Sequence, residues 1–490
     1  MKLATKRKEP LFYASLGVLL CLLLVRLITM DVIPLNDSTE ARYAEIARIM
    51  VETGDWITPM HRYGEPFWAK PPLSMWLSAV MMRAFGVSAL TARLPGFFCS
   101  CGVLWLIWGV AKHQHGKTMA MNAVLILAGS FYFLLNAGTV MTEPVLVLCL
   151  TLSMVSFWHA LQGTTHRRWG YLFFVGLGFG LLAKGPIACV LLGIPLFFWV
   201  VWQKAWRRLW HQLPWLTGGA LLLLIAVPWY VLAELKTPGF LNYFLVGEHL
   251  MRFVQPGWAG DKYGYAHVAP YGMIWVYLLL GTLPWGVCAV MKWRAIPSLW
   301  RGMDAWMGYL LLCGLMPLVF FTFARNIIYP YVFPSLPALA LLGAECVHQR
   351  GGIDAAQRVI LKLASVTAAA FLLVACVCAW KPELITKSHN RVIDYVQTIM
   401  KLPASALVYW GYRLEYSAQF YSHGQALATL DLQRLCDVFS DHQTHVLVHD
   451  STVLTPLPES VLSQLTWIHE MSLLKRKLTL YRVSDFTCPL

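Results

Sequence analysis

The segment from Asn36 to Leu73 concentrates residues that could do acid–base chemistry in a chain where only 13% of residues are charged. A carboxylate can accept a proton from a nucleophile, and a guanidinium or ammonium group can neutralise an anion. The segment therefore predicts an acid–base site for an anionic, lipid-borne substrate. Its ionisable residues are the acids Asp37, Glu40, Glu45, Glu52, Asp55 and Glu65 and the bases Arg42, Arg48, Arg62 and Lys70.

The composition is typical of a polytopic α-helical membrane protein. Hydrophobic residues make up 58% of the chain and the mean hydropathy is +0.56, more than one globular core can bury. The net charge of +14 would suggest nucleic-acid binding in a soluble chain. Here the cations collect in loops between apolar runs, the pattern of cytoplasmic loops in membrane proteins. We therefore expect membrane lipids, and no nucleic acid, as partners.

The apolar runs predict about eleven transmembrane helices, or thirteen if a pair is missed. The run from Leu11 to Met30 is interpreted as an uncleaved first helix and not a signal peptide, because no small-residue cleavage pattern follows it. The run 73–86 is too short to span and contains Arg83, so we expect a juxtamembrane helix. Further spans are expected near 90–111, 119–136, 144–161, 169–183, 187–203, 214–235, 268–291, 306–323, 329–347 and 359–380.

Cations then mark alternate loops, which places the 36–73 loop outside the cytoplasm. The cationic loops are 112–117, 167–168, 204–208, 292–301 and 350–358. We assign residues 1–380 to a transmembrane domain and 381–490 to a small exported α/β domain, because ordinary polarity returns after Trp380. Strands are expected at 406–410, 445–449 and 477–483, and a helix at 393–400. Cys436 and Cys488 could pair in an oxidising compartment.

Within the 36–73 loop, an amphipathic helix is expected from Thr39 to Met50. Its apolar residues Tyr43, Ile46, Ala47 and Met50 recur at helical spacing. Asp37 and Glu40 could also form a capping box at the start of this helix. Lys70 precedes a double proline, which would hold it in a shaped turn.

The strings STEARYAEIARIM, GDW and PFWAKPPLSMWL resemble the first periplasmic loop of bacterial lipid A aminoarabinose transferases. Those enzymes are related to the protein O-mannosyltransferases. The resemblance extends to about residue 350 and implies the C-type glycosyltransferase fold, with polyprenyl-phosphate sugars as donors. It also implies a bacterial inner-membrane location with the active site facing the periplasm.

Carried over residue by residue, the family's first acidic pair falls on Thr39-Glu40, so its first acid is missing here. A carboxylate associated with a metal ion precedes the Lys-Pro in the aminoarabinose enzymes, and Ala69 stands there in this chain. The resemblance therefore leaves a divalent metal in question, and no other cofactor is expected. Three further strings match the family, namely Thr142-Glu143-Pro144, the segment EHLMRF at 248–253 and the segment YPYVFP at 329–334.

Transfer from a lipid phosphodiester would release a phosphate that is a weak base and needs cations more than a general acid. The expected phosphate-binding residues are Arg42, Lys70, Lys184, Arg252 and Arg325, and the expected substrate-binding residues are Tyr43, His249 and Tyr331. The acceptor hydroxyl needs a carboxylate base. Glu40 is favoured for that role, with Asp37 and Glu143 as alternatives. Glu143 could instead stabilise a helix N-terminus, and Lys184 could extend toward the interface from a helix end.

The sequence thus predicts an inverting glycosyltransferase with two main partners. The donor would be an undecaprenyl or other polyprenyl phosphate sugar, and the acceptor lipid A, lipopolysaccharide or another envelope glycan. Transfer to Ser or Thr of exported proteins is an alternative within the enzyme class. A lipid or solute transporter is an alternative from another class, although transporters typically carry paired charges in mid-helix, and here the charges cluster at helix ends.

Overall fold

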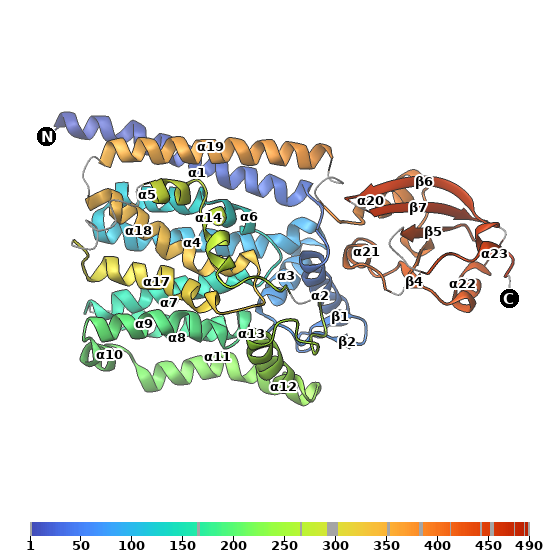
Figure 1. Ribbon diagram of the computed structural model, residues 1–490, viewed down its shortest axis with the longest axis horizontal. Coiled ribbons are helices and arrows are strands. Elements are labelled where there is room, and N and C mark those ends of the chain that lie inside the picture. Colours follow the sequence, from blue (N-terminus) through green and yellow to red (C-terminus); the bar gives the residue numbers. More distant parts are fainter. Residues whose placement is uncertain are drawn as a thin grey trace.

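A computed structural model shows a long bundle of helices joined at one end to a smaller mixed domain (Figure 1). The structure describes the chain except residues 1, 164–166, 265–266, 292–301, 350–352, 382–385, 412, 442, 451–454, 475, 485 and 489–490. The expected cationic loop 292–301 therefore lies outside the described residues.

The helices of the bundle run along its long axis (Figure 1), and each expected span coincides with a helix or a helix pair. Among the described residues, 7 helices are long and apolar enough to cross a membrane. The run 268–291 forms two helices bent by 110°, which gives up to 8 if the pair is one span. The prediction of a polytopic helical membrane protein is confirmed, whereas the number of crossings stays a prediction. The helices are α1 (Lys2–Val32), α4 (Ala89–His115), α5 (Lys117–Ala128), α6 (Phe131–Asn136), α7 (Glu143–Leu161), α8 (Arg168–Lys184), α9 (Ile187–Trp202), α11 (Trp215–Lys236), α14 (Met273–Gly281), α15 (Trp285–Met291), α17 (Ala305–Thr322), α18 (Leu336–Gln349) and α19 (Ile353–Trp380).

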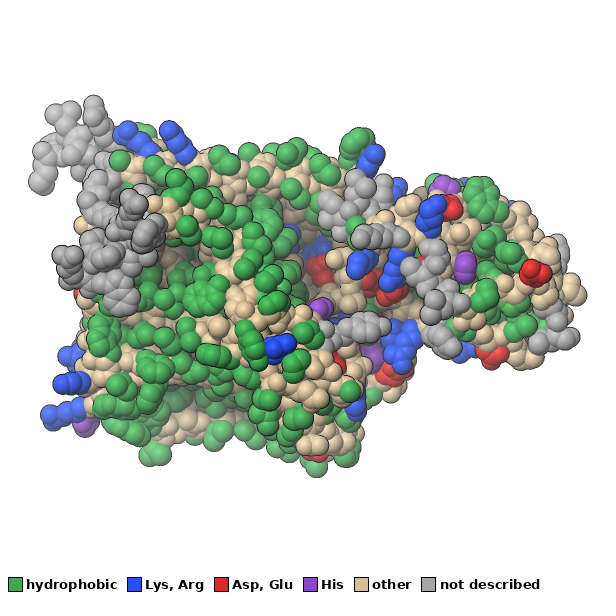
Figure 2. All heavy atoms as spheres, in the orientation of Figure 1, with side chains coloured by type: hydrophobic (Ala, Val, Ile, Leu, Met, Phe, Trp, Pro, Cys, Tyr) green, Lys and Arg blue, Asp and Glu red, His purple; other side chains and the backbone are tan. Residues whose placement is uncertain are grey.

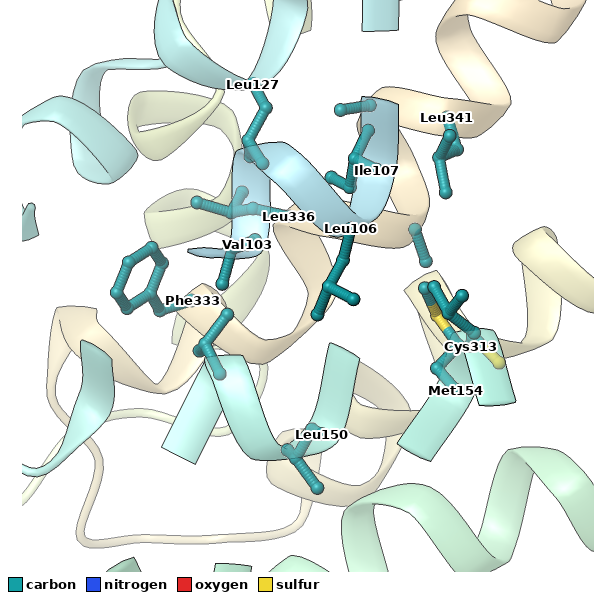
Figure 3. Close-up of a cluster of buried hydrophobic side chains, with 14 of the residues drawn as sticks. Val103, Leu106, Ile107, Leu127, Leu150, Met154, Cys313, Phe333, Leu336 and Leu341 are labelled. Atoms are coloured by element: carbon teal, nitrogen blue, oxygen red, sulfur yellow. The ribbon is translucent and has the colours of Figure 1, made fainter. Parts of the chain in front are cut away.

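The bundle core is a single large cluster of aliphatic and aromatic side chains (Figure 3). It draws residues from α4, α5, α7, α17, α18 and the 3-10 turn η3 (Tyr329–Ser335). Small residues let some helices approach closely, as is usual in membranes. A Cβ on Gly176 of α8 would lie 2.2 Å from the Ser153 hydroxyl of α7. The residues labelled in Figure 3 are Val103, Leu106, Ile107, Leu127, Leu150, Met154, Cys313, Phe333, Leu336 and Leu341.

The 36–73 segment folds at the end of the bundle that bears the smaller domain (Figure 1). The opposite end carries α10 (Trp206–Gln212), and Figure 2 shows Lys and Arg side chains gathered there. This arrangement agrees with the expected odd number of crossings, because the first loop and the chain's last domain share one side. The elements at the domain end are α2 (Thr39–Thr53), β1 (Met60–Arg62), β2 (Glu65–Pro66), α3 (Leu73–Phe85), α12 (Phe240–Asn242), the π-helix η1 (Tyr243–Met251) and α13 (Arg252–Val254).

The C-terminal domain is built on a five-stranded sheet of order β4-β3-β5-β7-β6. β3 pairs in parallel with β4 and β5, while β7 pairs antiparallel with β5 and β6. The three expected strands coincide with β3, β5 and β7, and the expected Cys436–Cys488 disulfide is present. The elements are α20 (Asn390–Asp394), η5 (Tyr395–Ile399), η6 (Ala404–Ala406), β3 (Leu407–Trp410), α21 (Tyr416–Tyr421), β4 (Leu427–Thr429), α22 (Leu432–Phe439), β5 (His445–Asp450), α23 (Glu459–Leu462), β6 (Thr466–Leu473) and β7 (Arg476–Val483).

Single-cysteine labelling checks this topology. In a cysteine-depleted background, Glu65→Cys at the domain end should react with a membrane-impermeant maleimide in intact spheroplasts. Lys117→Cys at the opposite end should react only after permeabilisation, since both side chains are exposed and lie at opposite ends of the bundle. Labelling of both residues in intact spheroplasts would contradict the assigned sidedness.

Candidate active site at the end of the bundle next to the C-terminal domain

The helix α2 is buried around most of its circumference, because Glu45, Arg48 and Ile49 are buried as well as the expected apolar face. Tyr43, Ile46, Ala47 and Met50 are all buried. The Tyr43 ring packs edge-on against Phe67, with centroids 5.8 Å apart. Burial of this face fixes the rotation of α2, so Tyr43 points inward from the start of the helix.

Glu40, the favoured base, is held by a buried guanidinium that sequence reasoning missed. Arg93 of α4 donates from Nε to Glu40 Oε1 at 2.8 Å and from Nη2 to Oε2 at 2.7 Å. Each oxygen also accepts a backbone N–H. Val140 donates to Oε1 at 3.4 Å, and Asn36 donates to Oε2 at 3.3 Å. Burial alone would raise the pKa of Glu40, but the charge and bonds of Arg93 outweigh it and the pKa is lowered. The carboxylate is thus kept ionised, with its lone pairs already in use.

Asp37 faces the C-terminal domain. Its Oδ1 accepts the Ser417 backbone N–H at 2.9 Å, and its Oδ2 accepts the Ser417 hydroxyl. The capping-box interpretation is therefore wrong for Asp37, because its acceptors are used by α21 and not by α2. Glu40 does reach back toward the chain before α2, but it bonds the N–H of Asn36.

Lys70 belongs to a buried cluster built around Glu248, a residue of the EHLMRF segment that the sequence did not single out as a site residue. Glu248 Oε2 accepts from Lys70 Nζ and from Arg252 Nη1, each at 2.9 Å. Its Oε1 accepts the Tyr243 hydroxyl at 3.2 Å, and Arg252 also lies 3.4 Å from Asp261. The Glu248 side chain is 1% exposed, whereas those of Lys70 and Arg252 are 19% and 25% exposed. The cations, and not the carboxylate, therefore face accessible space.

Glu143 and Lys184 form a second buried ion pair. Lys184 Nζ donates to Glu143 Oε1 at 2.8 Å and lies 4.5 Å from the ring centroid of Tyr331, a cation–π distance. The Thr142 hydroxyl donates to Glu143 Oε2 at 3.2 Å. The pair joins the start of α7 to the end of α8, beside the expected Tyr331.

His249 lies against the backbone that carries Lys184. Its Nδ1 is 2.8 Å from the Phe244 carbonyl oxygen and its Nε2 is 3.3 Å from that of Lys184. Burial lowers the pKa of His249, although both carbonyl contacts oppose the shift. A neutral imidazole carries one N–H, so it donates to only one of these two carbonyl oxygens at a time.

Tyr43 lies within the electrostatic reach of both ion-pair clusters. Burial raises the pKa of its hydroxyl, Arg42 lowers it, and the charges of Glu143 and Glu248 raise it further. The structure thus brings Tyr43, Lys70, Glu143, Lys184 and Arg252 into one neighbourhood. Figure 2 shows acidic and basic side chains in a hollow where the bundle meets the C-terminal domain.

The two remaining expected phosphate ligands make other contacts. Arg42 bonds the Tyr263 carbonyl and lies over the rings of Phe67 and Tyr416, 5.4 and 5.6 Å from their centroids. Arg325 lies 4.6 Å from the ring centroid of Tyr271. Among the described residues, neither arginine has a carboxylate within ion-pair distance.

The donor set for a metal ion is poor. Ala69, at the position where the resemblance places a carboxylate, is a buried methyl group and supplies no ligand. In the described part of the chain, no three His, Cys, Asp or Glu side chains are arranged to hold an ion. These residues do not fit a metal, and no step of the chemistry below is assigned to one.

Comparison with known proteins agrees with this arrangement. Residues 10–244 match the family model for dolichyl-phosphate-mannose-protein mannosyltransferase. The chain is 33% identical over 353 residues to the undecaprenyl phosphate-alpha-4-amino-4-deoxy-L-arabinose arabinosyl transferase of Aeromonas salmonicida, and 30% identical over 320 residues to that of Edwardsiella ictaluri. These alignments cover 70% and 64% of this chain but only 59% and 55% of the relatives.

The same fold has been solved experimentally. The crystal structure of ArnT from Cupriavidus metallidurans bound to undecaprenyl phosphate superposes with a TM-score of 0.74, covering 95% of this chain and 97% of that one at 19% identity. The sequence comparisons support a resemblance of this chain to the lipid A aminoarabinose transferase and protein O-mannosyltransferase superfamily. The family resemblance and the fold expected from the 36–73 segment are confirmed.

The individual site roles stay predictions, and the geometry ranks them. Three expected residues, Lys70, Lys184 and Arg252, lie in charged clusters beside Tyr43. Glu248 and Arg93 were missed, although each carried a signal. Glu248 stands in a segment that already resembled the family, and Arg93 is an ionisable residue within an apolar run, which usually marks a specific partner.

Docking of the C-terminal domain through Asp37 should depend on pH. Burial raises the pKa of Asp37 from 3.8 to about 7 and Glu415 adds to the shift, whereas the Ser417 bonds and Arg476 oppose it. The docked state therefore favours the protonated acid, and the Asp37 contribution to docking should be full below about pH 4, weaken as pH rises to about 7 and level off above that. Hydrogen exchange of α21 in the full-length protein would report the change.

Two variants sharpen this measurement. Asp37→Asn keeps the shape of the protonated acid and should remove the weakening of docking with rising pH, while Asp437→Asn, at an exposed residue of α22, should retain it. His61 contributes with the opposite sign, because burial lowers its pKa from 6.5 to about 4 and the docked state therefore favours the neutral ring; its contribution to docking strengthens as pH rises from about 4 to 6.5. An unchanged pH profile in Asp37→Asn would refute the assignment.

Proposed function

We propose that this chain is an inverting membrane glycosyltransferase that moves a sugar from an undecaprenyl or other polyprenyl phosphate to lipid A or another envelope acceptor. The observation that carries the proposal is the pair of buried ion clusters, Lys70–Glu248–Arg252 and Glu143–Lys184, whose carboxylates both act electrostatically on Tyr43. The names of the relatives and the lipid phosphate bound to the solved structure support it.

The Lys70–Glu248–Arg252 cluster suits the donor phosphate. Glu248 aligns an ammonium group and a guanidinium group on one carboxylate oxygen, so both cations are positioned before the substrate arrives. Their partly exposed heads can then bind the phosphodiester, and a guanidinium fork matches phosphate oxygens well. Because the cations are already ordered, little side-chain entropy is lost on binding.

Glu143 is the carboxylate best placed to act as the base. The oxygens of Glu40 are occupied by the Arg93 fork, and those of Asp37 by Ser417. Both Glu143 oxygens are also occupied, by Lys184 and by the Thr142 hydroxyl, but each by a single hydrogen bond and not by a guanidinium fork, and Lys184 could turn toward the donor phosphate and free the carboxylate. We therefore assign Glu40 to structure and Glu143 to proton transfer, which revises the preference drawn from the sequence.

The step would proceed by direct displacement at the anomeric carbon. The acceptor hydroxyl oxygen forms the new bond to that carbon while its proton passes to Glu143. The bond between the anomeric carbon and the phosphate oxygen breaks, and the polyprenyl phosphate leaves with its charge held by Lys70, Arg252 and Lys184. Attack opposite the leaving group inverts the anomeric centre.

We further propose that the reaction takes place on the periplasmic side of the bacterial inner membrane. The fold places the first loop and the C-terminal domain at one end of the bundle, and the cations gather at the other (Figures 1 and 2). Cytoplasmic loops are the cation-rich ones.

A second acceptor class is supported by the family model. Residues 10–244 match the model for dolichyl-phosphate-mannose-protein mannosyltransferase, so Ser or Thr of an exported protein is the alternative acceptor. Both acceptors present a hydroxyl group, and the same base and phosphate site would serve either. Mass spectrometry of envelope glycolipids and glycoproteins in a deletion strain would separate the two.

A transfer assay with purified protein, polyprenyl-phosphate sugars and envelope lipid tests the activity and the base together. Glu143→Gln should lower turnover by about 100-fold or more, the scale of loss of a general base, with donor affinity nearly unchanged. Glu40→Gln should instead lower the thermal stability, because it leaves Arg93 buried without its counter-charge. Glu65→Gln, an exposed carboxylate of the same loop, is the control.

The outcomes of that assay separate the assignments. If the Glu40→Gln protein has normal stability but no turnover, and the Glu143→Gln protein is active, then Glu40 is the general base. No transfer by the unaltered protein across a broad panel of donors and acceptors would reject the glycosyltransferase proposal.

The phosphate site is tested by titrating undecaprenyl phosphate into the detergent-solubilised protein. Lys70→Ala and Arg252→Gln should each raise the Kd by about 10-fold or more, because each removes a charge-assisted contact to phosphate. Arg325→Ala, whose guanidinium lies on Tyr271, should change the Kd much less. Equal effects of all three variants would contradict the assigned site.

A further inference from the structure

A second cavity lies at the end of the bundle opposite the candidate active site. Its volume is about 480 Å³, and it is an open depression lined by the end of α7, the turn from α9 into α10, α10 itself and the start of α17. Figure 1 places α10 far from the first loop and the C-terminal domain. The cavity therefore belongs to neither ion cluster described above.

The lining of this cavity is strongly basic. It includes four side chains that are or can become cationic and three amides, with no Asp or Glu among its residues. These are Lys204, Arg207, Arg208 and His211, with Gln162, Gln203 and Gln212. Amides and guanidinium groups together supply many N–H donors around one space.

These cations differ from those of the candidate active site in having no counter-charge. Lys70, Lys184 and Arg252 each pair with a carboxylate. Within the described residues, none of the cavity's four basic side chains lies within ion-pair distance of an acid. Lys204, Arg207, Arg208 and His211 are exposed and solvated in the free protein, so an anionic ligand can bind them without displacing a protein carboxylate.

Aromatic side chains place this cavity at the depth of lipid headgroups. Trp206 and Trp210 of α10 are 44% and 63% exposed, and Trp202 at the end of α9 is 46% exposed. Exposed tryptophans at helix ends are typical of the membrane–water boundary. A soluble anion would not need such a setting, whereas a phospholipid has its phosphate at this level.

We propose that this cavity binds the phosphate headgroup of an anionic phospholipid in the leaflet opposite the candidate active site. Arg207 and Arg208 would hold the phosphodiester, and Lys204 and the amides would bind its remaining oxygens. Cytoplasmic loops of membrane proteins generally contain an excess of Lys and Arg, which accounts for basic residues at this end of the bundle. It does not explain why four basic side chains and three amides line the same cavity. This inference does not rest on the proposed function.

Native mass spectrometry of the full-length protein tests the proposal, with phosphatidylglycerol, cardiolipin and phosphatidylcholine as probes. Arg207→Gln combined with Arg208→Gln should lower retention of the anionic lipids by about 10-fold, as expected for the loss of two charge-assisted contacts. The matched control is Lys112→Gln combined with Lys117→Gln, which removes the same charge from exposed residues at the same end of the bundle. That control should bind lipid nearly as the unaltered protein does.

Further arms of the experiment decide among the alternatives. If both double variants lose the same amount of bound anionic lipid, the lipid is held by general surface charge and not by this cavity. Displacement of the lipid by millimolar inorganic phosphate would overturn a lipid ligand in favour of a soluble one. Arg207→Lys with Arg208→Lys should retain part of the binding, and thermal unfolding of every variant must match the unaltered protein for a loss to count.

Discussion

The buried ion pair between Arg93 and Glu40 is the constraint on which the end of the bundle next to the C-terminal domain depends. Beyond the two contacts to Glu40, Arg93 donates to the carbonyls of Met30, Ile33 and Pro34 at the end of α1. Carbonyls at a helix C-terminus lack partners within the helix, so a guanidinium there satisfies several at once. One side chain of α4 thus fixes where α1 ends and where α2 begins. Removing either partner would leave a charge buried and unpaired.

Packing against this junction positions the other residues of the candidate active site. Glu40 fixes the start of α2, and the apolar face of α2 then sets the direction of Tyr43. The double proline after Lys70 ends the loop at α3, which brings the ammonium group to Glu248 of η1. This end of the bundle is therefore a set of mutually neutralising pairs, whereas the cations around α10 have no such partners among the described residues. The two sites therefore differ in charge balance. The cations of the candidate active site are ordered by carboxylates before the substrate binds, whereas we propose that the cations around α10 bind an anionic lipid.

The sequence predicted those features that depend on local spacing. The apolar runs predicted the membrane helices. The helical spacing of four apolar residues predicted that Tyr43, Ile46, Ala47 and Met50 of α2 are buried. Short β-rich runs predicted β3, β5 and β7. Partners far apart in the chain could not be found in this way. Lys70 meets Glu248 across 178 positions, and Asp37 meets Ser417 across 380. Periodicity shows which face of an element is buried, but not which distant side chain supplies the opposite charge.

The role of Asp37 illustrates why this limit matters for function. Its place beside Glu40 in the sequence suggested catalysis or capping, but the fold turns it toward α21 of the C-terminal domain. Around that contact, the Tyr416 hydroxyl bonds His61 at 3.0 Å, the Tyr421 hydroxyl accepts the Leu35 N–H at 2.8 Å, and the Tyr416 ring lies under Arg42.

The C-terminal domain therefore contacts the chain on both sides of the start of α2. Any movement of α21 would shift Leu35, Asp37 and Arg42 together, and with them the helix that carries Tyr43. Because α2 is short and is flanked by loops, contacts from the C-terminal domain can restrict it in a way that the membrane helices alone cannot. The domain thus contacts the segment from Leu35 to Arg42, which leads into the part of α2 that carries Tyr43.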